Sequence, residues 1–177
     1  NMEYPHCLQI ETAQVCNAAC SFCPYSSMGR DTSARMPEPL FQRLINEAAS
    51  WENPPPQICP FLTNEPFADV RMAELCSYVN EKLPQAQIVF FTNGSLFSDR
   101  QLQRLEPVKN IAEVYLSLHY WEPEAYERDL KIPWLKTLAS MHRLIGWNRL
   151  YNKVGKIALF RTVPALQHEV SNAEGSS

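Results

Sequence analysis

The 177-residue sequence contains no apolar run close to the roughly 20 residues that cross a membrane. Residues 1–6 lack the charged and apolar regions of a secretory signal. The sequence also lacks a strong excess of charge of either sign: the formal net charge is −3, and lysine and arginine are scattered along the chain. We therefore expect no membrane partner, and nucleic acid is disfavoured because no polyanion-binding surface is indicated. The six cysteines, without an export signal, favour metal binding or catalysis in a reducing cytoplasm over disulfides.

The ligand pairs of a structural zinc site are incomplete. The four histidines form no H-x3-5-H pair, and Cys7, Cys59 and Cys76 are isolated from one another. A structural zinc site uses four ligands, usually as two close pairs. Only Cys20 and Cys23 form such a pair, so a zinc-binding interaction domain remains an alternative that lacks half of its ligands.

Three cysteines, Cys16, Cys20 and Cys23, stand at spacings of four and three after a short strand-like run at residues 8–13. Thiolates are soft ligands that favour iron–sulfur clusters, zinc and copper(I), and close-spaced loop cysteines commonly hold cubane clusters. Four thiolates would close such a cluster. Three leave one iron with open coordination, as a cluster that binds and acts on a small molecule requires.

The motif C-x3-C-x-[aromatic]-C, with Phe22 in the aromatic position, resembles the signature of the radical S-adenosylmethionine (radical SAM) enzymes. The resemblance implies a [4Fe–4S] cluster on Cys16, Cys20 and Cys23, with SAM chelating the fourth iron. One electron from the cluster would cleave SAM and release a 5′-deoxyadenosyl radical, which abstracts hydrogen from the substrate.

Residues 63–66, T-N-E-P, stand where the family usually has G-G-E-P. The resemblance implies that Thr63, Asn64 and Glu65 pair with the SAM amino group, partly through backbone carbonyls. Thr63 and Asn64 replace two glycines, which allows a different backbone path here. A plain turn at the end of a strand is the alternative.

Two later segments also resemble family motifs that lie near SAM. The first is T-N-G at residues 92–94, in which Thr92 is the better contact candidate because Asn-Gly is an ordinary turn dipeptide. The second is S-L-H at residues 117–119, where the family often has S-[LI]-D. Ser117 would hydrogen-bond the SAM ribose or carboxylate. His119 replaces the aspartate and either faces the substrate as a candidate catalytic group or is simply a satisfied polar residue.

Arg161 lies among apolar residues in the last predicted strand. A buried arginine needs an anionic partner, and a carboxylate is the natural bidentate one. The SAM carboxylate is one candidate, and Glu65 or Glu113 would be a structural alternative. Phe22 would shield the cluster or the adenine from water, or would serve only in packing.

Apolar patterns predict strands over 8–12, 57–62, 86–91, 111–118 and 156–163. They alternate with four helices: one that begins at the prolines of 37–39, one capped by Asp69, one with a capping box at Ser98 and Gln101, and one that begins at Pro133 and stops near Gly146. Segments 25–35 and 122–131 are predicted to be loops. Near-continuous apolar strands favour an α/β fold with a parallel sheet buried on both faces.

Such a chain curls into part of a barrel. It is similar to the radical SAM partial (β/α)6 barrel, apparently lacking the last β/α unit, through truncation or because this is a shortened member. We expect residues 1–165 to form the core and residues 166–177 to be a polar tail, weakly ordered or cut short.

The expected function is a radical SAM enzyme core with an external electron donor of the flavodoxin or ferredoxin type. Cys23-Pro24, residues 30–36 and the following helix resemble members with SPASM or twitch domains. A peptide is the favoured substrate class, because an extended chain can pair with a strand edge. Alternatives are a non-catalytic iron–sulfur redox or assembly module, favoured by the altered Thr63 and Asn64, and the zinc-binding domain. The sequence does not specify the substrate, the reaction outcome or the oligomeric state.

Overall fold

The computed structural model describes residues 4–29 and 31–161 of the chain. Its centre is one five-stranded sheet in which every neighbouring pair is parallel and the spatial order follows the sequence. The strands are β1 (Cys7–Gln9), β2 (Gln57–Cys59), β3 (Gln87–Thr92), β4 (Ile111–Ser117) and β5 (Val154–Phe160). The predicted five-stranded parallel α/β fold is confirmed. The predicted tail, 166–177, lies outside the described residues.

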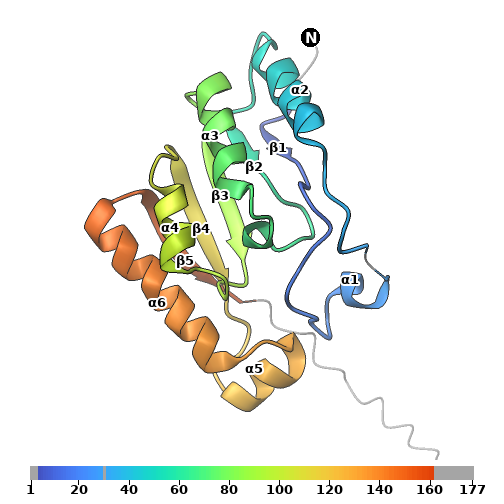
Figure 1. Cartoon of the computed structure of the whole chain (residues 1–177), viewed down its shortest axis with the longest axis vertical. Coiled ribbons are helices and arrows are strands. Elements are labelled where there is room, and N and C mark those ends of the chain that lie inside the picture. The colour runs from blue at the N-terminus through green and yellow to red at the C-terminus, as the bar shows by residue number, and fades with distance from the viewer. Residues whose placement is uncertain (1–3, 30, 162–177) are drawn as a thin grey trace, which may run out of the picture.

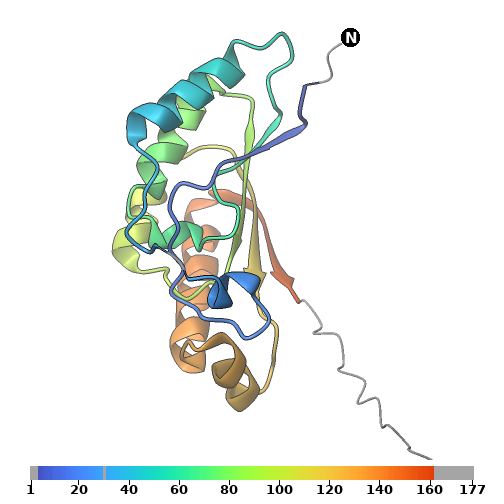
Figure 2. The same cartoon turned by 90° about the vertical axis from the view of Figure 1, so that its right-hand side faces the viewer.

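Four helices connect the strands: α2 (Glu38–Ala49), α3 (Met72–Lys82), α4 (Asp99–Leu105) and α6 (Trp134–Tyr151). They lie together on one side of the sheet, as Figures 1 and 2 show. Two further helices, α1 (Pro24–Ser27) and α5 (Pro123–Leu130), lie at the end toward which the strand arrows point (Figure 1). No helix in the described ranges is long and apolar enough to cross a membrane.

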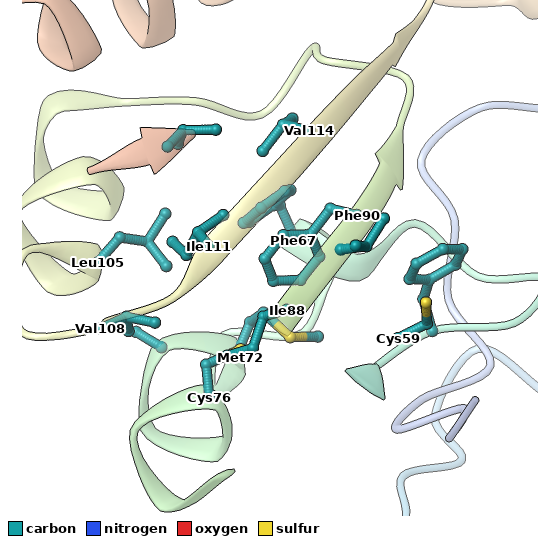
Figure 3. Packing of buried hydrophobic residues seen from close by; sticks show 14 of the residues in the cluster. Cys59, Phe67, Met72, Cys76, Ile88, Phe90, Leu105, Val108, Ile111 and Val114 are labelled. Atoms are coloured by element: carbon teal, nitrogen blue, oxygen red, sulfur yellow. The ribbon is translucent and has the colours of Figure 1, made fainter. Parts of the chain in front are cut away.

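The core fills the space between the sheet and these helices. Phe90 of β3 packs against Phe67 with ring centroids 4.9 Å apart, and Phe67 in turn packs against Phe97 at 4.6 Å. Met72 and Cys76 from α3 approach the same layer (Figure 3). Burying a large apolar side chain contributes about 1.5–3 kcal/mol, so this layer supplies much of the driving force for folding.

The predicted burial on both faces of the sheet is wrong. The helices cover one face, whereas on the other Phe91 and Tyr115 are half-buried and Phe160 is 40% exposed. Crossovers of one hand place every connecting helix on the same side, and the curl of the sheet shelters the inner face only partly.

Helix predictions that rest on local patterns are confirmed. The helix predicted after Asp69 buries one apolar face, made of Met72, Leu75, Cys76, Val79 and Leu83. The predicted cap at Ser98 is present, because its hydroxyl accepts the backbone N–H of Gln101 at 3.3 Å, and α4 ends at Leu105. In α2, Phe41 and Ile45 are buried, although Leu40 is 37% exposed.

The predicted loop over 122–131 is wrong, because its central residues form α5. Pro123 occupies the first turn, where its missing N–H costs nothing, and the buried Tyr126 and Leu130 lie four residues apart on one face. The predicted loop over 25–35 likewise begins within α1.

The predicted stop of α6 near Gly146 is also wrong. The helix continues to Tyr151 and ends at Asn152, whose φ of 48° is left-handed. Leu135, near its start, is 78% exposed.

Two further boundaries differ from the prediction. Strand β2 stops at Cys59 because Pro60 has no N–H to offer the ladder. Helix α3 begins at Met72, with Arg71 rather than Asp69 at its N-cap. Asp69 instead accepts the backbone N–H of Arg71 at 3.1 Å and forms an ion pair with its guanidinium at 2.8 Å.

Candidate active site

The loops at the carboxyl ends of β1 to β4 line one cavity of about 210 Å³. Parallel strands of one sheet end at the same edge, so segments far apart in sequence meet there. The wall includes every predicted site residue except Arg161: Cys16, Cys20, Phe22, Cys23, Thr63, Asn64, Glu65, Thr92, Ser117 and His119.

The cysteine loop, residues 10–36, is held in place by backbone hydrogen bonds to distant segments. The Glu65 N–H donates to the Val15 carbonyl at 2.9 Å. The Ala19 and Ser21 N–H groups donate to the carbonyls of Leu130 and Asp129 at 3.1 and 2.8 Å. The last carbonyls of a helix have no partner within it, so the loop caps the carboxyl end of α5. Cys16, Cys20 and Cys23 are half-buried in this frame.

A closed ring of three side chains ties the cysteine loop to the turn after β3. The Asn93 amide donates to Asn17 Oδ1 at 2.9 Å, the Asn17 amide donates to Ser95 Oγ at 2.8 Å, and the Ser95 hydroxyl donates to Asn93 Oδ1 at 2.6 Å. The Ser95 backbone N–H adds a further hydrogen bond to Asn93 Oδ1 at 2.9 Å. Sequence reasoning missed Asn17 and Ser95, and their only signal was that Asn17 directly follows Cys16.

Glu65 is buried, with 3% of its surface exposed, and lies between the turns after β2 and β3. It accepts the Thr92 hydroxyl at 2.6 Å and the N–H groups of Asn93 and Phe67 at 2.8 and 3.2 Å. Burial raises the pKa of Glu65 to about 7, against these hydrogen bonds, which favour the charged form. The carboxyl group therefore fixes the relative position of two predicted SAM-contacting segments.

Residues 63 and 64 fill the positions where the family motif has glycines. The Thr63 hydroxyl and backbone N–H both donate to Glu11 Oε1. The Leu62 N–H donates to Asn64 Oδ1 at 3.2 Å. The Asn64 side-chain nitrogen is buried and has no hydrogen-bond partner among the described residues.

The aromatic residue of the cysteine motif contacts the histidine that follows β4. The rings of Phe22 and His119 lie 4.9 Å apart in an edge-to-face arrangement, which aromatic pairs favour. His119 is 7% exposed and Phe22 is 38% exposed. Ser117, half-buried, lines the cavity beside them.

Arg161 does not meet its predicted environment. It follows the last residue of β5 and is exposed, outside the cavity wall, so the predicted burial on the strand is wrong. The strand ends earlier than its apolar pattern indicated, at the edge of the described sheet. Glu113, offered as a partner for Arg161, instead accepts the Tyr115 hydroxyl at 2.5 Å and pairs with Lys156 at 3.3 Å.

The donor set fits a cluster with one open position. Three thiols from one loop share a cavity wall with Asn64, whose buried side-chain nitrogen has no hydrogen-bond partner among the described residues. Among the described residues, no three histidine, cysteine or acidic side chains are arranged to hold one metal ion. Zinc needs ligands that converge on one point, whereas a cubane offers a separate iron to each thiolate.

Comparison with known proteins gives a consistent result. The family model of the radical SAM superfamily matches residues 10–151. S-adenosyl-L-methionine-dependent 2-deoxy-scyllo-inosamine dehydrogenase of Niallia circulans is 24% identical over 98 residues, which are 55% of this chain and 39% of that protein.

Solved structures that share the fold include the following two. BtrN in complex with AdoMet and 2-DOIA superposes with a TM-score of 0.61 at 18% identity, over 89% of this chain and 57% of that one. SuiB of Streptococcus suis bound to S-adenosylmethionine gives a TM-score of 0.64 at 20% identity, over 88% of this chain and 33% of that one. The chain thus spans from a third to just over half of the length of these relatives. Since the family match includes the cysteine motif and the three later strand-end segments, the chain belongs to the radical SAM superfamily, whose members use a [4Fe–4S] cluster and SAM.

Proposed function

We propose that this chain is the core of a radical SAM enzyme that cleaves SAM reductively and starts its reaction by abstracting hydrogen from a substrate. The observation that carries the proposal is the single cavity shared by the three motif cysteines and the ends of β2, β3 and β4. A flavodoxin- or ferredoxin-type protein in a reducing cytoplasm would supply the electron.

Cys16, Cys20 and Cys23 would hold the cluster, which when bound supplies the electron for SAM cleavage. The hydrogen bonds at Val15, Ala19 and Ser21 hold the loop backbone on both sides of Cys16 and Cys20, so that the thiols need little rearrangement to bind. The Phe22 ring, packed edge-on against His119, would keep water from one side of the site.

The turns after β2, β3 and β4 would bind SAM. Backbone carbonyls of residues 63–65 are acceptors suited to its ammonium group, and the Glu65 carboxyl holds this turn against Thr92. Ser117 would hydrogen-bond the ribose or the carboxylate. Thr92 lines the wall, and its hydroxyl already donates to Glu65. Arg161 would contact the SAM carboxylate from outside this wall.

An aromatic array on the open face of the sheet supports a peptide substrate. Phe91 stacks on Tyr115 with centroids 4.5 Å apart, and Phe160 meets Phe91 edge-on at 5.3 Å. Phe91 also lines the cavity, so the array continues from it. A peptide could bury an apolar side chain here while its backbone remains near the cavity. SuiB, which shares the fold, has been crystallised with its precursor peptide SuiA.

Dehydrogenation of a small polar molecule is the second candidate, favoured by the sequence similarity to the N. circulans dehydrogenase. In either reaction His119, which is buried in the wall and in contact with Phe22, would be the candidate to face the substrate. Incubating the reduced enzyme with deuterated peptide and polyol libraries distinguishes the two, because the substrate transfers deuterium to 5′-deoxyadenosine.

Anaerobic reconstitution tests the proposal itself. We expect about four irons per chain and, with SAM and dithionite, formation of 5′-deoxyadenosine and methionine. Iron incorporation without SAM cleavage would instead identify a non-catalytic iron–sulfur module, and one zinc per chain would identify a zinc-binding domain.

A further inference from the structure

At residue 64 the family motif has a glycine, whereas this chain has asparagine. Only one end of the asparagine amide has a hydrogen-bond partner among the described residues. Its Oδ1 atom accepts the Leu62 N–H at 3.2 Å. The donor at Leu62 fixes the orientation of the amide, because an N–H must face the oxygen. The Nδ2 group is therefore the free end, buried and without a partner among the described residues.

A buried amide donor without an acceptor destabilises the folded chain, because the group has lost its hydrogen bond to water and gained none. Asn64 is 7% exposed, so bulk water does not offer the missing acceptor freely. Native proteins rarely leave such a group unpaired unless a ligand or an ordered water completes it. The group that completes this site must be an acceptor, which excludes the ammonium group of SAM.

The composition of the cavity wall indicates which acceptor this is. No lysine or arginine is among its lining residues, and Arg161 is exposed outside it. A carboxylate that entered the cavity would therefore depend on neutral donors. The hydroxyls of Thr63 and Thr92 already donate to Glu11 and Glu65, which leaves Ser117, already proposed for the ribose or the carboxylate, and Asn64 as donors for this group. The Asn93 amide already donates to Asn17.

We propose that the Asn64 side-chain amide donates a hydrogen bond to the methionine carboxylate of SAM and takes the place of a cationic carboxylate-binding residue. The proposal rests on the proposed function, since it requires SAM in this cavity. It assigns the side chain of Asn64 to the carboxylate, while the backbone of the same turn faces the ammonium group.

The test compares the affinities of two ligands for two variants of the cluster-loaded, oxidised protein. Asn64→Asp keeps the oxygen that accepts the Leu62 N–H and replaces the donor with an anionic oxygen. Asn64→Gly restores the residue of the family motif and removes the donor together with the oxygen that accepts the Leu62 N–H, so a loss caused by the turn itself should appear equally with both ligands. Dissociation constants are measured by anaerobic equilibrium dialysis for SAM and for decarboxylated SAM, which lacks the carboxylate but keeps the amine, sulfonium and adenosine.

We expect Asn64→Gly to weaken SAM binding by about tenfold and Asn64→Asp by on the order of a hundredfold. Decarboxylated SAM should bind the wild type and both variants within about threefold of one another, since it loses no hydrogen bond. The matched control is Asn80→Asp on α3, whose amide pairs with the Lys109 backbone away from the cavity and which should not change SAM affinity.

Equal losses for both ligands would mean that Asn64 only supports the turn, and unchanged SAM affinity in both variants would also overturn the proposal. If Asn64→Asp does not fold, the affinities of Asn64→Gly for SAM and for decarboxylated SAM test the proposal without it. A wild-type protein that loads its cluster but binds no SAM contradicts the proposed function as well, whereas wild-type SAM cleavage with unaltered Asn64 variants contradicts this inference only.

Discussion

The layer between β3, β4 and α3 and the cysteine loop are held in place by different forces. In the layer, Ile88, Phe90 and Cys76 are fully buried, and apolar burial supplies the stabilisation. In the loop, the three motif cysteines are only half-buried. The position of the loop depends on its hydrogen bonds to α5 and to the turns after β2 and β3. A change in the layer should therefore alter stability, and a change in the loop should alter cofactor binding.

The largest expected effect comes from the loop. Cys16→Ala, Cys20→Ala and Cys23→Ala should each reduce bound iron from about four per chain to near background and abolish formation of 5′-deoxyadenosine. The reason is that a three-thiolate site has no spare ligand. Iron is measured colorimetrically and the nucleoside by liquid chromatography.

Cys76→Ala is the matched control, because Cys76 is a fully buried cysteine in the apolar layer. It should keep its iron and lose about 1 kcal/mol of unfolding free energy. If Cys76→Ala lost iron as fully as the loop variants did, the division between the two regions would be wrong.

Phe90→Ala should have the largest effect on stability, lowering the free energy of unfolding by about 3–5 kcal/mol through lost burial and a residual cavity. Phe90 is fully buried and packs against Phe67 at 4.9 Å. Urea unfolding followed by circular dichroism measures the change. A loss below about 1 kcal/mol would show that the neighbouring side chains collapse into the space.

Glu65 lies between the two regions and should make stability depend on pH. Its pKa is about 7 in the folded chain, against an ordinary value of 4.5. Between these pH values the folded chain holds a proton that the unfolded chain has released. Stability therefore falls as pH rises from about 4.5, and levels off above about pH 7, after a total loss of about 3 kcal/mol.

Urea unfolding of the metal-free protein between pH 5 and 8 measures this slope, and Glu65→Gln should flatten it. Glu74→Gln, on the exposed face of α3, is the control that should keep the slope. A slope that survives in Glu65→Gln would have to be assigned to another group.

The smallest effect is expected on the surface of the layer. Arg104 and Glu74 form a two-pronged ion pair at 2.7 Å, with side chains 38% and 58% exposed. A double-mutant cycle should give a coupling below about 1 kcal/mol that weakens with added salt. A larger, salt-insensitive coupling would place this pair with the core rather than with the surface.

Sequence reasoning succeeded where structure follows from local pattern. The apolar face of α3 could be predicted because its residues from Met72 to Leu83 repeat with the period of a helix. The cysteine motif could be recognised because its three cysteines lie within eight residues of sequence. It failed for α5, where a proline and two apolar residues four apart were too short a pattern to be distinguished from a loop.

Partners far apart in sequence could not be predicted. The ring of Asn17, Asn93 and Ser95 joins residues up to 78 positions apart, and no local pattern records such a pairing. Burial of Arg161 was inferred from its apolar neighbours, but that inference does not show where a strand ends. The free amide of Asn64 depends on the direction of one backbone N–H, which only the fold reveals.

The pairing of the loop with α5 also has a consequence for the order of events during synthesis. Ala19 and Ser21 are synthesised before Asp129 and Leu130, whose carbonyls receive their N–H groups. Until those residues emerge, the nascent loop cannot adopt its final shape. The three thiols are therefore held in their final arrangement only after α5 has been synthesised and its last carbonyls have received these N–H groups.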